Sequence, residues 1–328
     1  MEKKSFGKLI SENVVVVTLI LLCILFGIGN HVFLSFKNIL NLLSQMCINA
    51  LLATGLVYVI ILGGIDISVG GTGALAGVFS AFVGLLMPNA NSIMMLIMQV
   101  AVAVLAGVVI GGIIGYLIAY LNVVPMICTL AMLNITRGLA YVVTGGQPVY
   151  GLANPYAFLG ATRLLKTEGM PNGIIPVITI FTVIVVFLMH ILLSKTVFGR
   201  HVYAVGSNRN VAHLSGINVK KTILLGHVIC SVMACLAGVA SASKIQNGQP
   251  GAMDAYEMYA IASAVLGGTS LVGGSGSVAR AMFGVAVIAV IKNGMDLMQI
   301  SSYWQKVVIG VIILLAVVLD MWQQKSKD

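Results

Sequence analysis

Two long stretches of this chain carry no charged side chain, and they limit its fold more than any other feature. No Lys, Arg, Asp or Glu lies between Lys37 and Asp66, or between Asp66 and Arg137. A helix that crosses a membrane needs about 20 mostly apolar residues, so the second stretch alone has room for about three. The core of a soluble domain does not need runs of this length. The sequence therefore predicts an all-α protein embedded in a membrane.

Apolar windows along the chain predict about ten transmembrane helices, some of them broken at Gly-rich segments. We expect them to form one transmembrane domain that covers residues 1–328. The expected spans are 14–34, 41–62, 72–87, 93–121, 124–143, 174–193, 222–243, 257–272, 278–299 and 303–320. The third and eighth are short. Residues 144–173 contain three prolines and are expected to be the longest loop outside the cell, without a regular helix throughout.

The basic residues indicate how the chain is oriented. The net charge is +9, and Lys and Arg gather at helix ends and in the loop 194–221, which contains no acid. An even number of spans puts both termini on one side, and the positive-inside rule places them and this loop in the cytoplasm. The N-terminus resembles a signal peptide but lacks an A-x-A-like cleavage site, so we interpret it as a retained first span.

Motifs for cofactor chemistry are missing from the sequence. The five cysteines lie in apolar stretches, with no C-x-x-C and no disulfide or metal spacing. There is no G-x-x-x-x-G-K-[ST], H-E-x-x-H or G-x-S-x-G motif. Basic residues do not alternate with aromatic ones, as they do where bases stack. We therefore expect no catalytic residue, no metal, no nucleotide or other cofactor in this chain, and no nucleic-acid partner.

Asp66 is the most informative single residue, because it is the only acid between Glu12 and Glu168. It lies with Ser68 in "LGGIDISVGG". An ionisable group at membrane depth usually faces protein or water and has a function, so both residues are candidates for the substrate pathway. Alternatively, Asp66 caps the helix that follows it.

Arg137 and Asn134 are further pathway candidates on one predicted span. Arg137 either pairs with Asp66, lines a wet cavity, or extends its guanidinium to a membrane face.

A second polar group lies near the C-terminus. Lys292 and Asp296 are four residues apart, share a helix face and are interpreted as a structural pair. Asn293 and Gln305 carry amides that can bind the hydroxyl groups of a substrate, so they join the predicted pathway.

Two glycine motifs resemble each other, "GGIDISVGG" at residues 63–71 and "GGTSLVGG" at residues 267–274. Paired motifs of this kind can mark the substrate site of transporters built from repeats. The alternative is that glycine is simply common in this chain, which has 37. The glycines predicted to break helices are Gly63, Gly64, Gly267, Gly268, Gly273 and Gly274.

The segment 194–221 is long for a connector and contains "VGSNRNVAHLSGINVKK". Gly206 and Asn208 can break and cap a helix, so the segment predicts a short helix that ends at Gly216. Ala212 and Ser215 are small residues that allow another surface to approach. The segment therefore reads either as a docking element for a cytoplasmic partner or as an ordinary positive-inside loop. The candidate docking residues are Arg200, Gly206, Asn208, Ala212, Ser215 and Gly216.

These motifs, in this order, resemble those of the ribose-type sugar permeases, the membrane subunits of bacterial ABC importers for monosaccharides. "GGIDISVG" is similar to that family's G-I-D-L-S-V-G. "GRHVYAVGSNRNVAHLSGINV" and "IASAVLGGTSLVGGSGSV" are similar to its cytoplasmic-loop and second glycine motifs. The resemblance covers nearly the whole chain. The chain departs from the pattern at Asn210-Val211, where Glu-Ala is common, and at Arg280, where Gly is usual.

The resemblance implies a permease of the bacterial inner membrane. A second permease copy, identical or different, would complete a central pathway, and a periplasmic sugar-binding protein would deliver the sugar. A cytoplasmic ATPase would bind ATP and Mg²⁺, grip the region 199–219 and supply the energy. The cargo would be a ribose-like pentose or a related sugar, or else a polyol or sugar-like signalling molecule.

Two other classes remain as alternatives. An ion-coupled secondary transporter of a small polar solute would use Asp66. A membrane enzyme would need clustered catalytic residues, and the sequence shows none.

Overall fold

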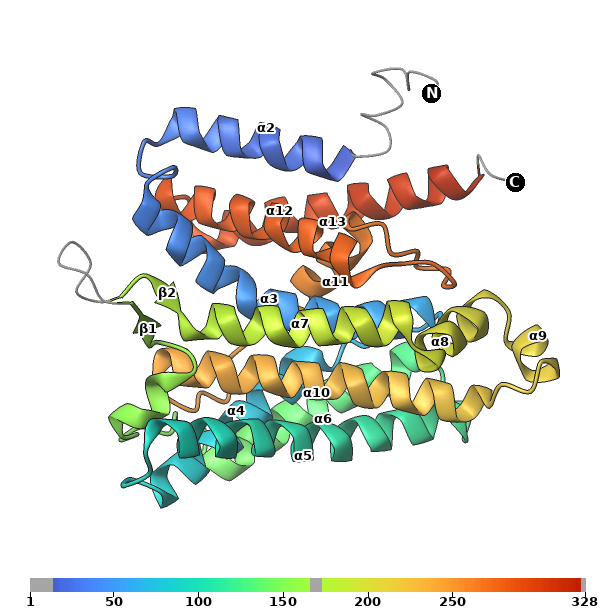
Figure 1. Cartoon of the computed structure of the whole chain (residues 1–328), viewed down its shortest axis with the longest axis horizontal. Helices are drawn as coiled ribbons and strands as arrows, with labels where there is room; N and C mark the ends of the chain where they lie inside the picture. Colours follow the sequence, from blue (N-terminus) through green and yellow to red (C-terminus); the bar gives the residue numbers. More distant parts are fainter. Residues whose placement is uncertain (1–13, 166–172, 326–328) are drawn as a thin grey trace.

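The computed structural model describes residues 14–165 and 173–325, and most of this part of the chain is helical (Figure 1). The all-α class is therefore confirmed. The helices are α2 (Val14–Gly29), α3 (Phe36–Ile61), α4 (Val69–Leu86), α5 (Ser92–Ala119), α6 (Pro125–Thr144), α7 (Val177–Lys195), α8 (Val197–Ser207), α9 (Arg209–Leu214), α10 (Val219–Ile245), α11 (Tyr256–Leu266), α12 (Val278–Leu297) and α13 (Ser302–Lys325).

Seven helices of the described part have the length and composition of a membrane span, namely α3, α4, α5, α6, α7, α10 and α12. The expected number of about ten is not confirmed. The expected spans 14–34 and 303–320 correspond to α2 and α13, whose apolar parts are shorter. The expected span 257–272 was wrong, because α11 ends at Leu266 after 11 residues. A helix of that length rises only about 16 Å, roughly half of the hydrocarbon core.

The helix at the centre of the bundle is α3. In its span, 89% of residues are buried, against 28% for α5 and 22% for α7. It contacts α7, α8, α10, α11 and α12, so it is enclosed by other helices along most of its length. The apolar side chains of α5 and α7 that no helix covers form the surface suited to lipid, since lipid tails are as apolar as these side chains.

Glycine brings the backbones of neighbouring helices into contact around α10. Gly107, Gly111 and Gly115 follow each other at intervals of four on α5. A Cβ atom at these positions would lie 2.5, 2.7 and 2.8 Å, respectively, from the nearest atom of α10. On the adjacent side of α10, a Cβ at Gly238 would lie 1.8 Å from the carbonyl oxygen of Gly73 in α4. Such close approach provides the van der Waals contact that holds membrane helices together.

The two ends of the bundle differ (Figure 1). α8 and α9 lie at one end, and the start of α2 and the end of α13 point the same way. At the other end lie the 3-10 helix η1 (Asn154–Phe158) and a short antiparallel pair, β1 (Arg163–Leu164) and β2 (Ile175–Pro176). The expected outer loop 144–173 thus has no regular helix beyond η1 in its described part. Residues 166–172 lie outside the described residues. We call these the α8–α9 end and the β1–β2 end.

Candidate functional site

The polar segment 194–221 folds into α8 and α9, and a side-chain cap fixes the start of each helix. The side-chain oxygens of Thr196, Asn208 and Asn218 accept hydrogen bonds from backbone N–H groups two or three residues further on, at 2.9–3.2 Å. These bonds satisfy N–H groups that have no partner inside the helix. The three caps therefore set the starts of α8, α9 and α10.

The predicted short helix corresponds to α9, which ends at Leu214. Gly216 follows with a φ of +81°, a conformation that suits glycine. Ala212 is buried against the bundle, so it does not offer the open surface that we expected of it. The side chains of Val211 and Leu214 are exposed instead, and Leu214 is 86% exposed. The exposed apolar surface of α9 therefore comes from these two residues.

Glycine also fixes α8 to the rest of the bundle. A Cβ atom at Gly206 would lie 1.8 Å from the carbonyl oxygen of Ile61, the last residue of α3. The same carbonyl accepts a hydrogen bond from the N–H of Gly274 at 2.8 Å. The hydroxyl of Tyr203 donates to the carbonyl of Gly276 at 2.8 Å. We call this meeting of α8, the α3–α4 loop and the α11–α12 loop the glycine junction.

Two polar side chains strengthen the glycine junction. The guanidinium of Arg209 donates to the carbonyl of Leu62 at 3.3 Å, which gives a partner to a backbone oxygen at the end of α3. Burial raises the pKa of the Tyr203 phenol, so its hydroxyl keeps its proton and remains a donor at physiological pH.

The six glycines predicted to break helices lie directly after helix ends or in the loop before α12. Gly63 and Gly64 follow α3, Gly267 and Gly268 follow α11, and Gly273 and Gly274 precede α12. The two similar glycine motifs, far apart in sequence, therefore lie next to each other at the glycine junction. They end helices near the α8–α9 end rather than interrupting one helix.

Asp66 lies at the start of α4 and is fully buried. Its Oδ1 accepts hydrogen bonds from the N–H (2.9 Å) and the hydroxyl (2.6 Å) of Ser68, the N-cap residue of α4. Asp66 therefore holds the residue that precedes the helix, whereas the direct cap that we considered for it does not form. Its Oδ2 lies 3.5 Å from Nδ1 of His227 on α10. Its partner is thus His227, a lone histidine in an apolar helix that we did not single out. The pairing of Asp66 with Arg137 was wrong.

Arg137 binds a non-helical segment instead. Its guanidinium donates to the carbonyls of Pro250 at 3.1 Å and of Ala252. These carbonyls belong to the connection between α10 and α11, where Met253 and Ala255 have φ values of +58° and +62°. Irregular backbone among membrane helices needs such partners, because lipid supplies none. Arg137 thus holds the chain that leads into the half-length helix α11.

The remaining pathway candidates are not gathered around one cavity. Asn134 is exposed on α6 and donates to a carbonyl of its own helix. The buried amides of Asn293 and Asn38 exchange hydrogen bonds of 2.8 and 3.1 Å and join α12 to α3. Gln305 donates to Asp296 at 2.7 Å. Asn293 and Gln305 therefore connect helices in this structure.

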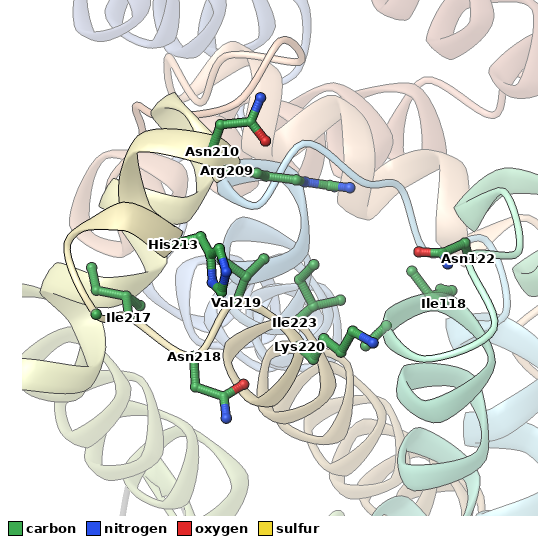
Figure 2. A pocket seen from close by; sticks show the side chains of 12 residues that line it. Ile118, Asn122, Arg209, Asn210, His213, Ile217, Asn218, Val219, Lys220 and Ile223 are labelled. Atoms are coloured by element: carbon green, nitrogen blue, oxygen red, sulfur yellow. The ribbon is translucent and has the colours of Figure 1, made fainter.

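A pocket of about 580 Å³ opens at the α8–α9 end. In Figure 2, Arg209 and His213 line it from α9, Ile118 and Asn122 from the end of α5, and Lys220 from the start of α10. Its charged lining is basic. In the described part of the chain, no group of three His, Cys, Asp or Glu residues could hold a metal ion.

Comparison with known proteins defines the class of this one. A family model described as "Branched-chain amino acid transport system / permease component" matches residues 38–317. The match covers most of the chain, so the protein belongs to this family of transport permeases. It is a multi-pass membrane protein of bacterial transport systems, not an enzyme.

The similar proteins carry sugar-transport names. The chain is 40% identical to the ribose import permease protein RbsC of Bacillus subtilis over 92% of this chain and 90% of the relative. It is 34% identical to RbsC of Escherichia coli K12, covering 96% and 95%. It is also 34% identical to the L-arabinose transport system permease protein AraH of that strain, covering 98% and 94%. No solved structure matches the chain.

The glycine junction makes a testable prediction about stability. We expect Gly206→Ala to lower the free energy of unfolding by about 1–3 kcal/mol, because the added methyl group overlaps the Ile61 carbonyl. Gly112→Ala is the matched control, since nothing lies within 4 Å of a Cβ there. Alanine in that helix interior should stabilise the protein by up to about 1 kcal/mol. Thermal unfolding in detergent measures both, and equal midpoints for the two variants would contradict the prediction.

The role of Asp66 can be tested with two substitutions. Asp66→Ala leaves the Ser68 N–H without its acceptor and should cost about 1–3 kcal/mol. Asp66→Asn keeps a carbonyl oxygen that can accept from Ser68, so it should lower the free energy of unfolding by less than Asp66→Ala does. The thermal unfolding midpoints of the two variants in detergent measure this difference. An Asn variant as unstable as the Ala variant would show that the charge opposite His227 dominates.

Proposed function

We propose that this chain is the membrane-spanning subunit of an ATP-driven importer that moves a monosaccharide of the ribose class across the bacterial inner membrane. The similarity to ribose and arabinose permeases supports this, because it extends over at least 90% of each chain compared. A separate cytoplasmic ATPase binds ATP and Mg²⁺ and supplies the energy.

The observation that carries the proposal is the glycine junction. A motor outside the membrane needs a rigid element to act on, and α8 is joined by backbone contacts to the end of central α3 and to the loop that leads into α12. Arg200 on α8 and Val211 and Leu214 on α9 are exposed and form the surface for the ATPase. The basic pocket beside α9 offers a recess for an acidic or polar group of that partner.

The periplasmic partner is assigned to the end of the molecule opposite to α8 and α9. A periplasmic sugar-binding protein delivers the sugar to the β1–β2 end, and a second permease copy, identical or different, completes the pathway. Within this chain, Asn134 is the predicted pathway residue whose side chain is exposed. Asp66, Ser68, Asn293 and Gln305 serve to position helices, because each has a hydrogen-bond partner inside the protein.

Reconstituted transport tests the function. Proteoliposomes that contain the chain with its co-encoded ATPase should take up radiolabelled D-ribose only when the binding protein and Mg-ATP are both supplied. Uptake that continues without ATP and stops with an uncoupler would contradict the proposal. It would favour an ion-coupled secondary transporter.

The orientation can be tested with cysteine labelling. Ser215 is exposed on α9, and Tyr150 is exposed in the loop that follows α6. A membrane-impermeant maleimide should label Tyr150→Cys in intact spheroplasts, and Ser215→Cys only after permeabilisation. The unmodified chain is the control, because four of its five cysteines are buried. Labelling of Ser215→Cys from outside would place α8 and α9 beyond the reach of any ATPase.

A further inference from the structure

A small cavity with several polar side chains in its wall lies between α3, α10, α11 and α12. Its volume is about 70 Å³. The last turn of α10 contributes to it, and α10 starts at the α8–α9 end and runs away from it, so the cavity lies toward the β1–β2 end (Figure 1). The lining residues are Gln45, Ile48, Asn49, Lys244, Tyr256, Tyr259, Ile288, Ala289 and Lys292.

Two lysines from different helices converge on this cavity. The ammonium group of Lys244 donates to the backbone carbonyl of Ser44 at 3.3 Å. The ammonium group of Lys292 lies 5.4 Å from the ring centroid of Tyr256 and 5.6 Å from that of Tyr259. Among the described residues, the Lys244 ammonium thus has the dipole of a backbone carbonyl as its partner, and the Lys292 ammonium has two tyrosine ring faces. These are weak partners for a cation among membrane helices.

No carboxylate of the described side chains compensates for these charges. The acidic side chains that lie within 4 Å of a basic side chain in that part of the protein are Asp66, beside His227, and Asp254, beside Lys306. The pair of Lys292 with Asp296 suggested by their spacing does not form, because Asp296 accepts from Gln305 instead.

A third cation lies nearby. Arg163 donates to Asn41 on α3, three residues before Ser44. Like charges at close range repel one another when water is scarce, so the three cations favour an anion between them.

The cavity also holds free hydrogen-bond acceptors. The side-chain oxygens of Gln45 and Asn49 are buried, and neither has a partner in the described structure. The amide nitrogen of Asn49 is already bound to the hydroxyl of Ser263 at 2.8 Å, so its oxygen is the free atom. A buried polar atom without a partner is costly, and a donor from a ligand would remove this cost.

We propose that this cavity binds the carboxylate of a sugar acid. The lysines would hold the carboxylate, and the amide oxygens would accept from the sugar hydroxyls nearest to it. The volume suits one carboxyl group with its nearest hydroxyls, since it equals the space of about five water molecules. The sugar part of this ligand rests on the proposed function, whereas the anion part rests on the cavity alone.

Binding to the purified full-length chain tests this, without the ATPase or the binding protein. The chain is placed in nanodiscs of neutral phosphatidylcholine, which removes anionic lipid as a competing ligand. Its thermal midpoint is measured with sodium D-galacturonate, with D-galactose plus sodium chloride at equal ionic strength, and with sodium acetate. We expect galacturonate at about ten times its Kd to raise the midpoint by about 2 °C, and the other two to have no effect.

Variants decide whether the cavity is responsible. Lys244→Gln and Lys292→Gln should each abolish the shift caused by galacturonate. Lys220→Gln is the matched control, because Lys220 also lies 5.4 Å from a tyrosine ring, that of Tyr120, but at the opposite end of α10. This variant should keep the shift.

Three results would overturn the proposal. They are an equal shift with galactose, an equal shift with acetate, and a galacturonate shift that survives in the double variant Lys244→Gln/Lys292→Gln. Because the assay involves no transport, it can fail while ATP-driven uptake succeeds, and the reverse also holds.

Discussion

Close backbone contact at glycine is the constraint on which the rest of this structure depends. Between helices in lipid, the hydrophobic effect offers no attraction, so stability comes from packing and hydrogen bonds. Gly107, Gly111 and Gly115 allow α5 to lie directly on α10, while Gly73 and Gly238 do the same for α4. The same helix, α10, packs against the central α3, which α7, α11 and α12 also cover. The loops after α3 and α11 meet α8 at the glycine junction.

The few polar groups inside the bundle mostly serve this architecture. Asp66 holds the start of α4, and Asn293 joins α12 to α3. Arg137 supplies donors to the irregular chain before α11. Lys244 and Lys292 are the exception, because their charges remain without a carboxylate near them. In this protein, the polar groups that complete the fold thus differ from these two partly buried lysines, which the proposed anion site explains.

The sequence predicted the all-α membrane class and a short helix within the segment 194–221, but it did not predict which residues meet. Long uncharged runs predict spans reliably, because the bilayer requires them. The span at 257–272 was wrong because hydropathy continues past Leu266, whereas the turn at Gly267 and Gly268 ends the helix. The partner of Asp66 could not be read from spacing, since packing of α10 against the α3–α4 loop brings His227 to it. The interval of four between the glycines of α5 was a readable signal that we did not use.

The carbonyl oxygen of Ile61 has a mechanical consequence. It meets the backbone of α8 on one side and accepts the Gly274 N–H on the other, so α8, α3 and the approach to α12 share one stiff joint. Flexible side chains would absorb part of a displacement, whereas peptide groups in direct contact pass it on with little slack. In the proposed importer, a push on α8 would therefore shift the innermost helix and its neighbour together. A compound that binds between these backbones would uncouple the ATPase from the transmembrane helices without occupying the substrate pathway.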